Sequence, residues 1–109
     1  MMTEVSTHKE QTKVMLHELG FPSHYSGYRK LCIAIPRYAQ DPEQNLAKEV
    51  YPFVTQELGC SGDIESSIRR TIAWAWEHGN RSTWEKYFPG FTKAPQNLIF
   101  ISTLAEHLN

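Results

Sequence analysis

The chain has 109 residues, and its 11 lysines and arginines against 12 acidic residues give a formal net charge of −1. One hydrophobic core is expected, because domains cluster near roughly 100–150 residues. The near-zero charge argues against a protein that coats nucleic acid or membranes non-specifically. No apolar run approaches the roughly 20 residues of a membrane span, and the polar N-terminus carries no secretory signal. Two cysteines, Cys32 and Cys60, do not make a disulfide framework, so a reducing cytoplasm is the expected location.

Apolar residues at helical spacing predict a first helix that ends at Gly20, since glycine commonly follows the last turn of a helix. Its apolar face comprises Val5, Met15, Leu16 and Leu19, with Thr12 between them. A second helical pattern runs over residues 25–39 and contains Pro36. We expect Pro36 to kink this helix or to end it early, because proline lacks the amide hydrogen.

The segment Asp41-Pro42-Glu43-Gln44 is typical of a helix start, with Asp41 as the capping residue and Pro42 in the first turn. The apolar stripe that follows is closed by Gly59, and Pro52 is expected to divide it and to open a short new helix. Residues 63–78 carry the longest helical pattern of the chain.

The segment Ser82-Thr83-Trp84-Glu85 has the spacing of a capping box and predicts one more short helix. Residues 89–95 read as a loop, and a last helix is expected over residues 96–108. Strand patterns are weak throughout. The sequence therefore predicts a single all-α domain over residues 1–109, a compact bundle of about five to seven short helices.

The most informative region is residues 52–79, where a short helix, a glycine-containing turn and a second helix follow one another. Such a turn lets two helices cross at roughly 90–120°, as in a helix-turn-helix. On the second helix, the predicted buried face comprises Ile64, Ile68, Thr71, Ile72 and Ala75. The opposite face comprises Ser66, Arg70, Ala73 and Glu77, with Arg69 at its edge and Glu65 on the flank.

This outer face suits a recognition helix. Short side chains let a helix enter the major groove, and arginine can bond guanine with two hydrogen bonds. The carboxylate of Glu65 can accept from cytosine, and Ser61 leaves the amides at the helix start open to a phosphate. The same pattern, however, is typical of any amphipathic surface helix, and Asp63, Glu65 and Glu77 offset the arginines. No basic patch is therefore expected.

Particular residues add a resemblance to a known family. They are His17-Glu18-Leu19-Gly20-Phe21-Pro22-Ser23-His24, Gly27-Tyr28, Tyr51-Pro52, Ile68-Arg69, Ile72, Ala75-Trp76, Gly79-Asn80, Lys93-Ala94, Asn97, Phe100-Ile101, Ala105 and Leu108. In order and spacing they resemble the DNA-binding effector domain of the sporulation master response regulator, over roughly Thr12 to Leu108. The resemblance implies an all-helical effector domain with a helix-turn-helix that binds a short promoter element.

The resemblance also implies roles for single residues. Glu65 and Arg69 match base-contacting positions of the family's recognition helix, and Arg70 matches a basic residue that reaches phosphate. We expect Ser66 beside them to face the bases, and Ser61 and Lys93 to position phosphates. Asp63 and Ser66 stand where the family tends to have arginine.

Those two departures leave an alternative open: an interaction module that has lost DNA binding and modulates a related full-length regulator. The family's phosphoacceptor receiver domain is not expected in this chain, which is either a stand-alone effector or an excised domain. On DNA we expect two copies, because small modules gain affinity by pairing, with the last helix as one candidate contact. The expected location is the cytoplasm, at the nucleoid.

Other chemistry has little support in the sequence. The five histidines lack the ligand spacing of a metal site, and no phosphate loop or nucleophile motif occurs. No metal, cofactor or small-molecule ligand is therefore expected, and the chain is not expected to be an enzyme. Trp74 departs from the apolar stripe of its helix and is a candidate partner contact.

Overall fold

The computed structural model describes residues 4–59 and 62–108, with side chains from residue 8 onward. The described residues form helices joined by loops, without a strand, in a body measuring 33 × 32 × 27 Å. The helices are α1 (Glu4–Leu19), α2 (Ser26–Gln40), the π-helical segment η1 (Leu46–Val50), α3 (Tyr51–Leu58), α4 (Ile64–His78), α5 (Arg81–Tyr87) and α6 (Asn97–Ala105). The prediction of a compact all-α bundle is confirmed.

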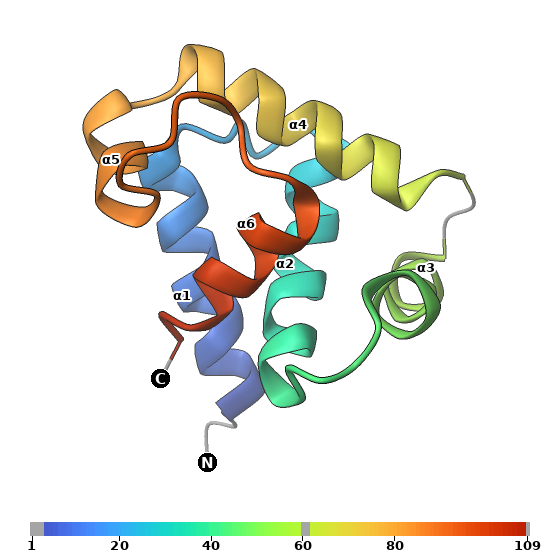
Figure 1. Cartoon of the computed structure of the whole chain (residues 1–109). Coiled ribbons are helices and arrows are strands. Elements are labelled where there is room, and N and C mark those ends of the chain that lie inside the picture. Colours follow the sequence, from blue (N-terminus) through green and yellow to red (C-terminus); the bar gives the residue numbers. More distant parts are fainter. Residues whose placement is uncertain (1–3, 60–61, 109) are drawn as a thin grey trace.

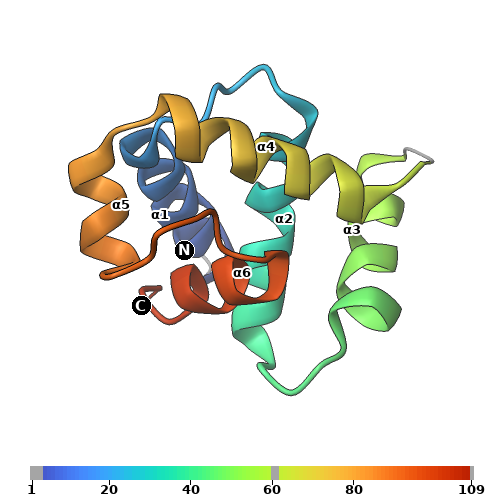
Figure 2. The same ribbon diagram turned by 45° about the horizontal axis from the view of Figure 1, so that its top comes forward.

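α2 is the central helix of the bundle. It packs against α1, α3, α4 and α6, and its contact with α4 is the most extensive between any two of these elements. α4 lies across one end of the molecule; α1 runs toward it from the opposite end, and α2 starts beside it and runs back (Figure 1). α6 lies against α2 beneath α4, and α3 lies to the side of α2 (Figure 2).

An aromatic cluster fills the core under the C-terminal half of α4. Phe88 stacks on Phe100 with ring centroids 5.5 Å apart, and Trp84 lies 5.8 Å from the Phe100 ring. Phe21, from the loop after α1, lies 5.4 Å from the Phe100 ring and 6.1 Å from the Trp84 ring. Because buried aromatic rings contribute large apolar areas, this cluster joins the loop after α1 to α5 and α6.

Pro36 does not end α2, which continues to Gln40. The expectation of an early end was therefore wrong. Proline removes one backbone hydrogen bond, and here the loss falls near the end of the helix. Pro36 and its neighbour Ile35 are buried in the core, and this burial offsets the missing bond.

Asp41 does not begin a helix. It is the residue that ends α2, and the next helical segment starts four residues beyond the predicted position, at Leu46. The cap there is Asn45, whose side chain accepts from the Lys48 amide at 2.8 Å, while the Glu49 carboxylate accepts from the Asn45 amide at 2.8 Å. This reciprocal pair satisfies free amides at the helix start. The Asp41 carboxylate instead accepts from the Glu43 amide, in the turn between α2 and η1.

The other predicted boundaries also shift slightly. α5 is capped by Asn80, whose side chain accepts from the amides of Ser82 and Thr83, so Ser82 is not the cap. Pro52 lies in the first turn of α3, as predicted. The last helix is shorter than the predicted residues 96–108.

Candidate nucleic-acid interface

The helices α3 and α4 lie where the sequence predicts the two helices of a helix-turn-helix, over residues 52–79. α3 ends at Gly59, whose φ of 63° lies in the left-handed region that favours glycine, and α4 begins after Asp63. The buried residues of α4 are Ile64, Ser67, Ile68, Thr71, Ile72 and Ala75. All five residues predicted for the buried face are among them, so the predicted orientation of the helix is confirmed.

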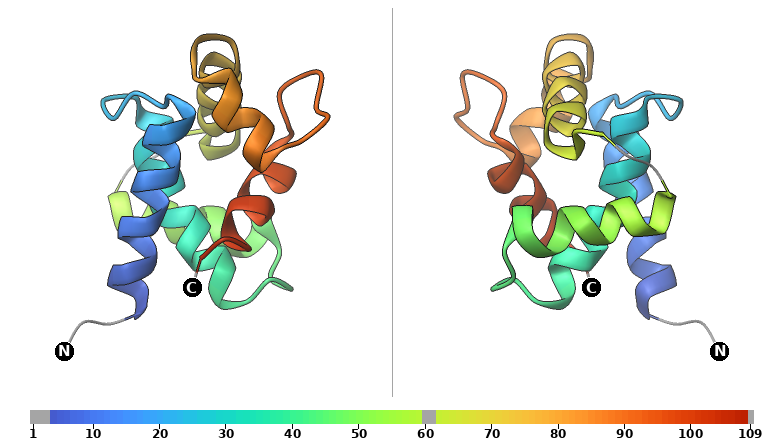
Figure 3. Two further views of the ribbon diagram at one scale, coloured as in Figure 1. Left: turned by 90° about the vertical axis from the view of Figure 1, so that its left-hand side faces the viewer. Right: turned by 90° about the vertical axis from the view of Figure 1, so that its right-hand side faces the viewer.

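The outer face of α4 forms a crest at one end of the molecule. Its exposed residues are Glu65, Arg69, Arg70, Ala73 and Glu77, and Ser66 is half-buried. Seen along α4, the loop after α1 lies on one side of the crest and the loop between α5 and α6 lies on the other (Figure 3). Lys93 is exposed in the second of these loops. The arrangement leaves α4 open to a partner, with a loop on each flank.

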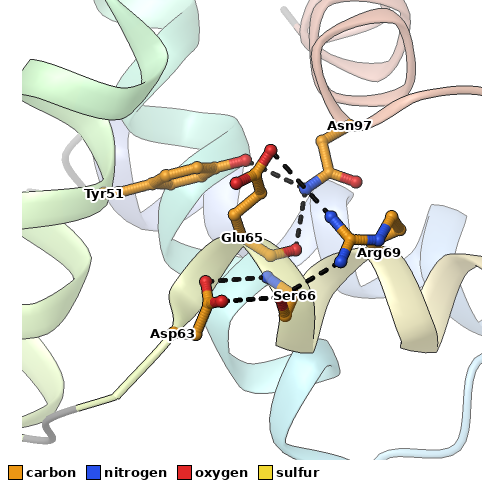
Figure 4. Close-up of polar contacts among 6 residues, drawn as sticks. All are labelled: Tyr51, Asp63, Glu65, Ser66, Arg69 and Asn97. Atoms are coloured by element: carbon orange, nitrogen blue, oxygen red, sulfur yellow. Dashed lines mark hydrogen bonds and ion pairs between the residues drawn. The ribbon is translucent and has the colours of Figure 1, made fainter.

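A chain of polar contacts runs along the first turns of α4 (Figure 4). The Asp63 carboxylate accepts from the Ser66 amide at 3.0 Å and from the Ser66 hydroxyl at 2.6 Å. The Arg69 guanidinium donates to the same hydroxyl at 3.1 Å. Asp63 is therefore the cap of α4, and Ser66 links this cap to Arg69.

Arg69 also lies near Glu65, with Nη1 and Oε2 4.0 Å apart. The side chains of Arg69 and Glu65 are 59% and 64% exposed. An exposed pair of this kind contributes at most about 1 kcal/mol, so a nucleobase can replace it as the partner of either group. Neither residue is covered by another part of the described chain.

Two hydrogen bonds from Ser66, its hydroxyl first and then its amide, lower the pKa of the Asp63 carboxyl. At neutral pH the Asp63 carboxyl is therefore ionised, and it accepts hydrogen bonds from the first turn of α4. A carboxylate at this position also interacts favourably with the helix dipole. Asp63 and Ser66 thus have a structural role as a capping pair at the start of α4.

Replacing Asp63 with alanine should lower the midpoint of thermal unfolding, because α4 loses its cap. Asp63→Asn is the matched control, since asparagine caps a helix comparably and should keep most of the stability. The pKa of Asp63 is lower in the folded protein than its ordinary value of 3.8. The contribution of Asp63 to the free energy of unfolding is therefore present above pH 3.8 and is lost as the pH falls through the folded-state pKa. Circular dichroism melts of the three proteins at neutral and acid pH test this. An asparagine variant as unstable as the alanine variant would contradict the capping role.

The buried side-chain amide of Asn97 supports the first turn of α4 from the core side. The Asn97 side chain, at the start of α6, donates to the Tyr51 hydroxyl at 3.1 Å and to the Glu65 backbone carbonyl at 3.0 Å (Figure 4). α6 and α3 are thereby tied to the turn of α4 that carries Glu65. Such support fixes the position of exposed side chains on a rigid element.

A polar cluster that was not predicted from the sequence lies on the flank of α4. The Lys30 ammonium donates to the Ser67 hydroxyl at 2.9 Å, and the Ser26 hydroxyl lies 2.9 Å from the same oxygen. This cluster adjoins a hollow of about 450 Å³ lined by His24, Tyr25, Ser26, Ser67, Arg70, Thr71 and Trp74. α2 begins at this hollow, and Tyr25 gives its first amides no side-chain cap.

Gly27 explains how α2 comes so close to α4. A Cβ atom at this position would overlap the Thr71 side chain and lie 2.9 Å from the Ser67 carbonyl oxygen. Glycine is therefore needed for the close approach, and the approach brings Lys30 to Ser67. Lys30 and Ser67 are 37 positions apart, so helical spacing could not predict their contact. The local feature that indicates a close approach of another helix to α2 is Gly27.

Trp74 is half-buried and packs within the chain. Its ring stacks on His78 at 4.4 Å between centroids and lies 5.3 Å from the Tyr25 ring. Its departure from the apolar stripe thus reflects contact with the loop after α1, so a partner is not needed to explain it.

Three further predictions concern Ser61, metal binding and membrane spans. Ser61 lies outside the described residues, and its predicted phosphate contact stays a prediction. Within the described part of the chain, no three His, Cys, Asp or Glu side chains come together as a metal site. None of the helices described is both long and apolar enough to cross a bilayer.

Comparison with known families agrees with the resemblance seen in the sequence. The family described as the sporulation initiation factor Spo0A C-terminal domain matches residues 12–108. This is the span over which the resemblance was found, and it contains α2 to α6 and the second half of α1. The family consists of DNA-binding regulatory domains.

Proposed function

The chain belongs to the family of Spo0A C-terminal domains, and from this membership we propose that it is a sequence-specific transcription regulator that places α4 in the major groove of a promoter element. The observation that carries the proposal is the exposed outer face of α4. A 15-residue helix is about 22 Å long, and the major groove, about 12 Å wide, admits one helix.

Glu65 and Arg69 are the proposed base-reading residues, with Ser66 beside them. Arg69 can give guanine two parallel hydrogen bonds, and Glu65 can accept from cytosine. Both lie in the first turns of α4, the part of a recognition helix that contacts base edges. The Ser66 hydroxyl already contacts Asp63 and Arg69, so we propose that it orients Arg69 as well as facing the bases.

Phosphate contacts are proposed on both flanks of α4. On one side Arg70 lines the hollow where α2 begins, and Lys30 contacts Ser67 at the same hollow. Uncapped amides at a helix start favour an anion. On the other side Lys93 lies in the loop between α5 and α6. Ser61 is the proposed contact in the turn. Together these positions would hold the two backbones that border one major groove.

We propose that the chain acts as a single effector domain, at the nucleoid in the cytoplasm, and that two copies bind adjacent half-sites. The capping role of Asp63 gives its carboxylate a function within α4, so the presence of this acidic residue does not argue against DNA binding. The second candidate function is an interaction module that does not bind DNA, and the exposed acidic residues beside Arg69 and Arg70 favour it.

Fluorescence anisotropy of two labelled duplexes separates these functions. One duplex carries the operator element of the family, and the other has the same bases in scrambled order. The regulator should bind the operator duplex more tightly, and the affinity should fall as salt rises, because phosphate contacts release counterions. Negligible binding to both duplexes would support the interaction module.

Replacing Lys30 with alanine should weaken binding to both duplexes alike and reduce the salt slope by about 1, because a phosphate contact carries no sequence information. Lys9→Ala is the matched control, since Lys9 belongs to the first half of α1, and α1 begins at the end of the molecule opposite α4 (Figure 1). Anisotropy titrations at several salt concentrations measure both effects. An unchanged slope for Lys30→Ala would exclude this residue from the interface.

A further inference from the structure

A small pocket lies on the side of the molecule formed by α1, α2 and α3. Its volume is about 130 Å³, and it is lined by Lys9, Cys32, Ile33, Pro36, Arg37, Gln40, Phe53 and Glu57. None of these residues belongs to α4, so the pocket is separate from the proposed DNA interface.

The floor of the pocket is apolar. Cys32 and Pro36 are buried, and Ile33 and Phe53 are half-buried. An apolar cavity of about 150 Å³ is known to hold benzene. The space here, about 130 Å³, therefore suits one aromatic ring or a hydrocarbon group of similar size.

Two cations border this floor. The Arg37 guanidinium lies over the Phe53 ring, 4.3 Å from its centroid, and its Nε is buried without a hydrogen-bond partner among the described residues. Lys9 is exposed at the rim. Glu57 also lines the pocket, but the described part of the chain shows no ion pair between it and either cation. Arginine commonly donates to carboxylates through its guanidinium nitrogens, so an anion in this pocket would find a cationic donor in Arg37.

The surface next to the pocket has the same character. A second hollow of about 280 Å³ shares Lys9, Cys32 and Ile33 with the first and is bordered by Lys13 and Arg29. Lys13 has a carboxylate partner, Glu10, at 3.9 Å. Although the whole chain has a net charge of −1, this face is basic around an apolar floor.

We propose that the pocket binds a small organic anion, a carboxylate carried on an aromatic ring or on a hydrocarbon group of about six carbons. The carboxylate lies between Arg37 and Lys9, and the apolar part contacts Ile33 and Phe53. Because Phe53 belongs to α3, the first helix of the proposed helix-turn-helix, the bound anion contacts the proposed DNA-binding unit through α3 and not through α4.

Benzoate and benzamide are matched probes, because they share one ring and differ in charge. The isotope-labelled full chain is titrated with each, and the Ile33 methyl groups and the Arg37 and Gln40 amides are followed by NMR. Benzoate should give saturable shifts at these positions and bind about fivefold more tightly than benzamide. Shifts elsewhere, no saturation or equal affinities would overturn the proposal.

Arg37→Gln tests the cation directly. It should abolish the preference for benzoate, whereas Arg37→Lys should keep part of it and Arg29→Gln, in the neighbouring hollow, should leave it unchanged. Circular dichroism checks that each variant is folded. A preference that persists in folded Arg37→Gln would also overturn the proposal. Because no DNA is present, this result is independent of the proposed regulatory function.

Discussion

Trp84→Ala should lower the free energy of unfolding by about 3–5 kcal/mol, the usual cost of deleting a large buried side chain. Trp84 is 1% exposed, and its ring packs against those of Phe88 and Phe100. Because domains of this size are stable by only about 5–15 kcal/mol, the variant should be near the limit of folding. Urea denaturation followed by circular dichroism measures the loss.

Trp84→Phe is the control for this prediction. It keeps a ring in the cluster but removes the hydrogen bond from the indole Nε1 to the Ala75 carbonyl, 3.1 Å long. The Ala75 carbonyl still accepts from the Gly79 amide at 2.7 Å, so no buried acceptor is left unsatisfied. This variant should therefore lose less stability than Trp84→Ala. Equal losses would show that the indole hydrogen bond, rather than the buried ring, supports the end of α4.

The helices that bury a wide apolar stripe could be predicted from the sequence. α4 is the clearest case, because Ile64, Ile68 and Ile72 recur at helical spacing and all three are buried. Helix starts were less predictable. Asp41 and Ser82 have capping sequences, but Asn45 and Asn80 cap the helices. Local sequence offers several caps within a few residues, and tertiary packing selects among them.

The candidate site was predictable where it depends on one helix. The exposure of Arg69 and Arg70 follows from the same periodicity that buries the isoleucines. The contacts of Lys30 and Asn97 could not be predicted, because each joins α4 to a helix far away in the sequence. The capping role of Asp63 could have been found locally, since Ser66 stands three residues later, where a helix start has a free amide.

Arg69→Ala should reduce the preference for the operator duplex over the scrambled duplex by about 1–3 kcal/mol, or roughly 5- to 150-fold. The loss of affinity should be larger for the operator duplex, because Arg69 contacts base edges there. On the scrambled duplex Arg69 is attracted only by the overall negative charge of the backbone. Arg69 is 59% exposed, so the substitution should change stability by no more than about 0.5 kcal/mol. Anisotropy titrations of both duplexes measure the preference.

Two further variants make this result specific. Arg69→Lys keeps the charge but loses the planar pair of donors, so it should lose preference while binding the scrambled duplex as the wild type does. Arg70→Ala should weaken both duplexes alike, because its proposed partner is a phosphate. If Arg69→Ala also weakens both duplexes equally, Arg69 contacts the backbone, and base reading by α4 depends on Glu65 and its neighbours instead.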